Sequence, residues 1–347
     1  RYYDNQEIEN FYRWLYSHSV TPARTYHMFG DVGPGWGPPN GALMWRVGRF
    51  DRKAASYAAW LLKDREPRGH LLSYVLMQKP LPEPRVPKSK LFMQGEAVFR
   101  EPADSPESLG AALYNITEDA QWHTHEETNA ISLAAYGARP LVNGGWLGDS
   151  TRPPARNNTL AIDGKRHEKR IGGGLVEGFT SEGFDYAVGD SGKALGDDAF
   201  RRSLMLVHGT EDLAGYFVVV DNVDADAGEK VHHYLQARTE SKIEAVADNR
   251  QYRATIDHHA EVTGVELSVF YATPPNAVKR TLVPSGDLER TPSYGKHYRL
   301  EAIYDTDEQG EARLLTVLAA RHPDHPSARL TSIGGENWSG ALVRHEA

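Results

Sequence analysis

Beyond residue 90 the chain is a series of short stretches in which apolar and polar residues alternate, and turn residues such as Asp163-Gly164 separate them. In a β-strand the side chains at i and i+2 share one face, so this alternation predicts strands that each bury one face. Long helical patterns between the stretches are missing, which argues against βαβ units. We therefore predict one large antiparallel β-sandwich. The stretches are 96–100, 111–116, 159–162, 203–207, 216–220, 232–236, 267–271 and 314–318.

The residues before this region have a different pattern. Apolar residues recur at helical spacing and predict helices over 5–16 and 42–62. A proline-rich stretch then predicts an extended linker. The sequence therefore predicts an α+β chain in three parts, which are a helical segment at 1–77, a linker at 78–90 and the sandwich at 91–347. Because two or three helices cannot easily bury a core of their own, they should pack on the sandwich or on further helices outside this chain.

Composition narrows the classes of partner. The chain has 347 residues and a net charge of -8, which argues against nucleic acid as its main partner, although the basic run 165–170 is a candidate site for an acidic ligand. It contains no cysteine, which excludes disulfides, thiolate zinc ligands and cysteine nucleophiles. No apolar run reaches the ~18 residues that a membrane-spanning helix needs. The 7 Trp and 17 Tyr slightly favour a carbohydrate-handling protein, while core packing explains most of them equally well.

Two histidines one residue apart precede the apolar run 130–136. If a strand begins at this point, His123, His125 and Glu127 project from the same face. Such a cluster is costly to bury without partners, so it faces solvent, holds a metal or acts on a ligand. Histidine is a frequent metal ligand and the usual general base near pH 7. An exposed polar strand end is the alternative to a functional site.

Several motifs occur in an order that resembles the heparinase II/III-like family of polysaccharide lyases. The most specific one runs from His123-Thr124-His125 to Asn129 and is similar to the family's His-x-His-x-Asp-x-Asn strand, followed at 137–145 by its Gly-x-Pro-Leu-Leu-x-Asp-x-Gly turn. The resemblance implies an incomplete (α/α) toroid joined to an antiparallel β-sandwich, with the active site in the cleft between them. The other motifs are the Gly-Asp turn at 29–31, the Asn-Asn-Thr segment at 157–164 and the arginine-led strand with its partner at 200–223.

The same resemblance implies roles for individual residues. His123 matches the family's catalytic histidine, and Glu127 is expected either to orient the histidines or to be a surface polar residue. The family's metal positions correspond to His125, Asn143 and Asn157, of which the last two replace an aspartate and a histidine. One imidazole and two neutral amides would bind zinc weakly. The alternatives are no metal, a harder ion such as calcium with water ligands, or a hydrogen-bonded polar cluster.

Five further residues are expected at the substrate, each with a plainer alternative. Arg100 would pair with a substrate carboxylate or with a nearby acidic residue, and Asn129 would orient the site or lie on the surface. Trp146 would stack on a sugar or anchor its loop. Tyr26 and His27 would line the cleft or serve as a helix cap and packing pair.

The resemblance therefore predicts a lyase that cleaves an acidic, uronate-containing polysaccharide by β-elimination, secreted or periplasmic. The chain matches only the end of the toroid and the sandwich, so we expect it to be the C-terminal portion of a longer enzyme whose other catalytic groups lie upstream. It begins at Arg1 without an initiator Met, so the absence of a signal peptide is uninformative. The alternative from a different class is a non-catalytic carbohydrate-binding or structural module that keeps the lyase fold.

Overall fold

The computed structural model describes most of the chain from residue 82 onward and two shorter segments before it. The predicted helix at 5–16, the first part of the one at 42–62, and Trp146 lie outside the described residues. Among the described helices, none is long and apolar enough to cross a membrane. The described ranges are 20–30, 52–63, 82–118, 123–144, 151–210, 214–247, 250–257, 262–283, 297–325, 328–335 and 338–345.

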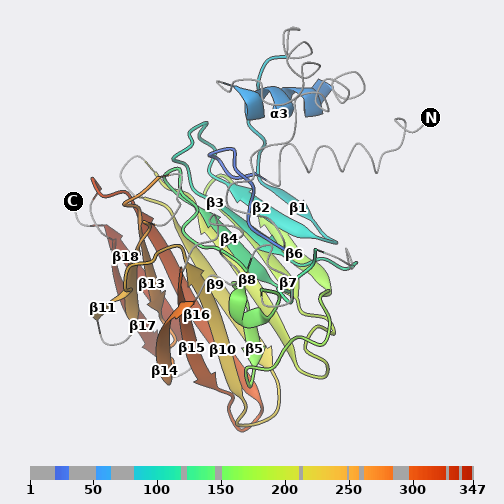
Figure 1. Ribbon diagram of the computed structural model, residues 1–347, viewed down its shortest axis with the longest axis vertical. Coiled ribbons are helices and arrows are strands. Elements are labelled where there is room, and N and C mark those ends of the chain that lie inside the picture. Colours follow the sequence, from blue (N-terminus) through green and yellow to red (C-terminus); the bar gives the residue numbers. More distant parts are fainter. Residues whose placement is uncertain are drawn as a thin grey trace.

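Strands dominate the described residues and pair antiparallel in four sheets (Figure 1). The largest sheet has eight strands in the order β11 (Glu244–Ala247), β12 (Gln251–Thr255), β13 (Glu266–Tyr271), β16 (Glu311–Arg321), β9 (Tyr216–Asp224), β8 (Ala199–Val207), β7 (Phe184–Asp190) and β6 (Gly174–Thr180). One four-stranded sheet has the order β1 (Lys90–Phe92), β2 (Glu96–Arg100), β3 (Gly110–Tyr114) and β4 (Ala130–Ala134). A second has the order β14 (Ala277–Val283), β15 (His297–Asp305), β10 (Lys230–Ala237) and β5 (Leu160–Ile162). The hairpin of β17 (Ala328–Gly335) and β18 (Trp338–His345) completes the set.

One continuous apolar core joins the eight-stranded sheet to both four-stranded sheets. Along β8 every second residue from Phe200 to Leu206 is buried, and β9 repeats the pattern from Phe217 to Val223. Apart from Arg202 and Asp221, these side chains belong to the same core cluster as residues of β2, β3, β4, β10 and β15. Burying each large apolar side chain contributes about 1.5–3 kcal/mol, so this layer is the main source of stability. The predicted antiparallel sandwich and all eight predicted strands are confirmed.

The histidine segment does not meet the condition under which its side chains would share one strand face. Residues 123–129 form an irregular loop, and β4 starts only at Ala130. Asn129 has a φ of 56°, in the left-handed region, which ends any extended run before the strand. His123 is exposed whereas His125 and Glu127 are buried, so the three side chains do not share a solvent-facing strand face.

The described helix, α3 (Arg52–Leu62), packs at the β1–β2 end of the sandwich (Figure 1). Its apolar face forms a small cluster with Val20 and Val86, so the segment around Val86 is docked on the helix. The Trp60 Nε1 donates to Asp104 Oδ1 at 2.9 Å, which ties the helix to the β2–β3 connection. Residues 82–89 contain no helix or strand, as a proline-rich linker should. The domain boundaries at 77 and 90 stay predictions.

A polar cluster lies inside the core between the sheets. Arg202 of β8 and Asp221 of β9 form a fully buried ion pair, with Nε to Oδ1 at 2.6 Å. His233 of β10 is also fully buried, and its Nε2 lies 3.8 Å from Asp221 Oδ2. Burial, and then the neighbouring Arg202 charge, lower the pKa of His233 to about 4, although Asp221 opposes the shift. His233 is therefore neutral in the folded protein at neutral pH.

Because His233 is buried in its neutral form, the protein should lose stability as the pH is lowered. Between pH 6.5 and about 4 the unfolded chain binds a proton at His233 that the folded protein excludes. As the pH is lowered through this window, we expect the free energy of unfolding to decrease by about 1.4 kcal/mol per pH unit for this proton. Urea unfolding at several pH values, compared with His233→Gln, measures it. A variant profile as steep as the wild-type profile would assign the acid sensitivity to other groups.

Candidate functional site

The histidine loop lies directly against the predicted Gly-Asp turn. The backbone N–H of Gly30 donates to Glu127 Oε1 at 2.6 Å. Gly30 has a φ of 55°, and a Cβ atom there would lie 2.3 Å from the carbonyl oxygen of His123. Both the backbone conformation and the close approach therefore require glycine. Two motifs nearly 100 residues apart in the chain are in contact.

Glu127 is the centre of a buried group of polar side chains. Its side chain is 0% exposed, and its Oε2 accepts a hydrogen bond from Asn143 Nδ2 at 3.3 Å. The same amide nitrogen of Asn143 lies 3.4 Å from the carbonyl oxygen of Gly30. Burial raises the pKa of Glu127, and nearby His125 together with the hydrogen bonds from Gly30 and Asn143 opposes this rise. The carboxyl group thus joins the loop to two other segments without facing solvent.

His125 faces the third of these segments. Its Nδ1 lies 3.3 Å from Oδ1 of Asn157, and both residues are fully buried. Asn157 follows the short 3-10 helix η3 (Pro154–Arg156), and its Nδ2 donates to the carbonyl oxygens of Thr151, Arg152 and Pro153 at 2.9–3.4 Å. Those three bonds identify Nδ2 as the donor side and aim Oδ1 at His125 and at the N–H of Gly144.

The structure brings together the three residues that the family resemblance assigns to a metal, but their chemistry does not fit a zinc site. Asn157 and Asn143 are neutral amides already bonded to protein groups, and both carboxylate oxygens of Glu127 accept N–H donors. Within the described ranges, no group of three or more His, Asp or Glu side chains is arranged to hold a metal ion. The side chains of His125, Asn143 and Asn157 make hydrogen bonds to protein groups, and whether they also hold an ion stays a prediction.

The two histidines have unequal surroundings. His123 is exposed at the start of the loop, while its backbone carbonyl abuts Gly30. His125 is enclosed by the Glu127–Asn157 cluster. Between them, Thr124 is buried as well. Of the two histidines, His123 is therefore the one exposed to solvent, and His125 is part of the buried polar cluster.

Asn129 is enclosed by protein rather than open to a ligand. Its side chain is 0% exposed, and its Oδ1 accepts from Asn115 Nδ2 at 2.6 Å. A Cβ on Gly189 of β7 would lie 2.1 Å from that same oxygen, so β7 approaches Asn129 closely. Because the side chain is occupied by protein groups, Asn129 serves to turn the loop into β4, and its effect on a substrate would be indirect.

Arg100 and His27 are likewise buried. The Arg100 guanidinium lies 5.2 Å from the Trp60 ring and donates to the carbonyl oxygens of Val20 and Pro87, so it links β2 to the helical segment. Burial lowers the pKa of Arg100 to about 9. His27 contacts Ser132 of β4 at 3.1 Å, and burial, then Arg100 and Arg139, lower its pKa well below 6.5. Both side chains therefore contact protein groups, and whether either one also contacts a substrate stays a prediction.

Tyr26, beside His27, is partly buried. Its carbonyl oxygen accepts from Arg139 Nη1 at 2.7 Å, and burial raises the pKa of its phenol to about 12. The hydrogen bond ties the Tyr26 backbone to Arg139, which follows β4, and the phenol is neutral at neutral pH. Whether Tyr26 or Trp146 contacts a sugar stays a prediction.

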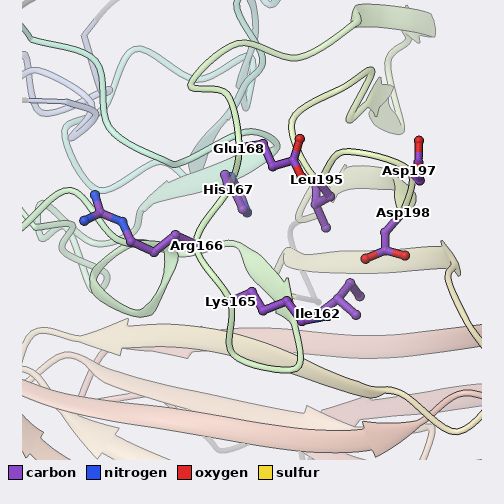
Figure 2. Close-up of a pocket in the computed structure, with 8 residues that line it drawn as sticks. All are labelled: Ile162, Lys165, Arg166, His167, Glu168, Leu195, Asp197 and Asp198. Carbon is purple, nitrogen blue, oxygen red and sulfur yellow. The ribbon is translucent and has the colours of Figure 1, made fainter.

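Residues 165–168 of the basic run line a pocket of about 210 Å³ (Figure 2). Lys165 is paired with Glu229 at 3.0 Å and with Asp163 at 3.6 Å. Figure 2 shows Arg166 extending away from the other lining side chains, and its guanidinium forms a bidentate pair with Glu126, with Nε 2.8 Å from Oε1. Sequence reasoning missed this pair because Glu126 and Arg166 are 40 residues apart. Lys165 and Arg166 are therefore each paired with a carboxylate, and the expectation that the run 165–170 binds an acidic ligand stays a prediction.

Comparisons with known proteins agree with this architecture. No family model matches the sequence, and no curated protein matches it. Among solved structures, a heparinase III with methylated lysines aligns with a TM-score of 0.68 at 16% identity, covering 98% of this chain and 52% of that one. A heparan sulfate lyase from Pedobacter heparinus gives 0.68 at 11% identity, with 94% and 51% covered. Another heparinase III gives 0.65 at 15% identity, with 99% and 55% covered.

These likenesses confirm the fold that the sequence motifs suggested. The chain spans about half the length of the solved structures it matches, which fits the expected C-terminal portion. At identities this low the likeness concerns the fold alone. The chain therefore has the β-sandwich architecture found in polysaccharide lyases of the heparinase III kind.

The close contact between Gly30 and the histidine loop can be tested by substituting Gly30 with alanine, which adds one methyl group. We expect Gly30→Ala to lower the free energy of unfolding by about 2 kcal/mol or more, because the new Cβ meets the His123 carbonyl and the backbone is left-handed. Denaturant unfolding measures this change. Gly95→Ala is the matched control, since a Cβ at Gly95 meets nothing within 4 Å. Equal stability of the two variants would contradict the contact.

Proposed function

We propose that the chain is the sandwich-bearing part of a polysaccharide lyase that cleaves a uronate-containing polysaccharide by β-elimination. The observation that carries the proposal is the exposed His123 held by its backbone against Gly30, above the buried cluster of His125, Glu127 and Asn157. The fold shared with heparinase III and heparan sulfate lyase structures supports it. Such a substrate lies outside the cell, so the proposal includes a secreted or periplasmic location.

The reaction has three requirements. A base removes the C5 proton of the uronate, a positive or hydrogen-bonding group neutralises the C6 carboxylate, and an acid protonates the departing O4. The C5 proton is weakly acidic, so stabilising the negative charge that develops on the carboxylate side should be the largest contribution. His123 can bind that carboxylate when protonated, or accept a proton when neutral. The remaining groups would come from the helical part of a longer enzyme.

The buried cluster has a supporting role in this proposal. Hydrogen bonds among His125, Glu127, Asn143 and Asn157 replace the metal that the family's motif would hold, and no step of the reaction is routed through an ion. A buried, hydrogen-bonded cluster next to a catalytic side chain limits the motion of that side chain and so keeps it oriented toward the substrate.

A second candidate is a carbohydrate-binding or structural module that keeps the fold without catalysis. Two observations favour it. The neighbouring cations Lys165 and Arg166 are already paired, and Asn143 and Asn157 stand where the family's motif has ionisable residues. The two candidates differ in whether product forms.

The deciding experiment incubates the full-length protein with alginate, heparan sulfate, chondroitin, hyaluronan and ulvan. We expect ultraviolet absorbance from the unsaturated uronate product with at least one of them. Gel retardation on the same polymers is measured in parallel. Retardation without product would establish the binding module, and no product from any polymer would remove the lyase proposal for these substrates.

The role of His123 is tested on whichever polymer is cleaved. We expect His123→Ala to lower kcat/KM roughly 100-fold or more while leaving thermal stability unchanged, because general acid–base groups contribute about this much and the side chain is exposed. His325→Ala, which removes another exposed histidine in the turn after β16, is the control and should keep wild-type activity. Activity retained in His123→Ala would make the histidine structural.

A further inference from the structure

One buried arginine connects the core to both segments of the candidate site. Arg202 uses Nε and Nη2 for Asp221, at 2.6 and 2.9 Å. Its remaining nitrogen, Nη1, donates to the carbonyl oxygens of Asn129 at 3.0 Å and of Asn158 at 2.9 Å. Four of the five guanidinium N–H groups are thus used, and the side chain is 0% exposed.

The two carbonyls belong to the two segments that build the site. Asn129 closes the histidine loop in its left-handed conformation, and Asn158 directly follows Asn157. The segments also contact each other, since the N–H of Ile131 donates to the Asn158 carbonyl at 3.2 Å and Thr159 Oγ1 donates to the Thr128 carbonyl at 2.5 Å. A single guanidinium therefore binds both segments at the point where they are hydrogen-bonded to each other.

Stability alone does not require an ion pair at this position. Well-packed apolar residues often replace a buried ion pair without loss of stability, because removing two charges from water costs several kcal/mol per ion. What apolar residues cannot supply is directed donors to two backbone carbonyls. A planar guanidinium presents its donors in a fixed fork, whereas a lysine ammonium is one point charge on a flexible stem. An arginine at this position therefore indicates that the two backbone carbonyls require hydrogen-bond donors in a fixed arrangement.

We propose that Arg202 is a positioning residue, aligned by Asp221, that fixes the histidine loop against the Asn157-Asn158 segment and so orients His123 and His125. The proposal rests on the proposed function only for its effect on activity. Its effect on the two segments follows from the hydrogen bonds themselves. His233 and the Phe200 ring also face the pair, at 3.8 Å from Asp221 and 5.8 Å from Arg202.

The adjacent residue provides a matched control. Arg201 points to the opposite face of β8, is exposed, and pairs with Asp190 at 2.8 Å. Arg201→Lys and Arg202→Lys are the same chemical change one position apart on the same strand. Only Arg202→Lys removes the fork that holds Asn129 and Asn158.

The test is amide hydrogen exchange in the full-length protein, followed over residues 123–131 and 157–161. We expect Arg202→Lys to accelerate exchange there roughly tenfold or more, with the Ile131 amide as the most direct reporter, because two bonds from a charged donor are lost. Arg201→Lys should leave these amides at the wild-type rate. Equal rates in the two variants would overturn the proposal.

A second variant covers the case in which Arg202→Lys does not fold. Asp221→Asn keeps the arginine and its two carbonyl bonds but removes the charge that aligns it. We expect a smaller acceleration in the same two segments. Acceleration confined to β8, β9 and β10, with residues 123–131 unchanged, would show that the pair only stabilises the core, and would overturn the proposal.

Activity gives an independent measurement. With a cleaved polymer, we expect Arg202→Lys to lower kcat more than it raises KM, because a misplaced catalytic group weakens the transition state more than substrate binding. A loss in KM alone would contradict positioning. If the wild-type protein cleaves no polymer, the proposed function fails, while the exchange experiment still decides the role of Arg202.

Discussion

The candidate site depends on burying an irregular and strongly polar segment at the edge of a sandwich core. Residues 123–129 lie outside any strand, so their polar groups need partners that no β-ladder provides. The protein supplies these partners from the Gly30 turn, from Asn143 and Asn157, and from Arg202 in the core. Because each partner comes from a different part of the chain, the loop can adopt this conformation only when the sandwich has assembled around it.

Neighbouring residues in this protein often have opposite surroundings, and the cause differs between strand and loop. On β8, Arg201 and Arg202 alternate between solvent and core as any strand requires. In the loop, His123 and His125 are divided by the turn geometry instead, which exposes the first and encloses the second. The same two-residue spacing that places side chains together on a strand therefore separates them here. This division leaves one accessible imidazole for the proposed chemistry.

Charge compensation also limits what the site can bind. Lys165 and Arg166 look like an anion-binding run in the sequence, but Glu229 and Glu126 neutralise them. Arg100 is used to join β2 to the helical segment. In the proposed function, His123 is the residue of the histidine loop that would contact a uronate carboxylate. The two asparagines, Asn143 and Asn157, are in hydrogen-bond contact with Glu127 and His125 without adding charge to the buried cluster.

The amino-acid sequence by itself determined the strands, the antiparallel class and the order of the motifs, because the alternation of buried and exposed residues is a local property of each strand. The family resemblance of its motifs also assigned His125, Asn143 and Asn157 to one site. Only the tertiary structure decided which side chains in those segments face solvent. An irregular loop has no hydrophobic period from which its exposed side chains could be predicted. The conformation of residues 123–129 depends on contacts with Asn157, Arg202 and Gly30, whose partners in the loop are 32, 73 and 97 residues away in the sequence.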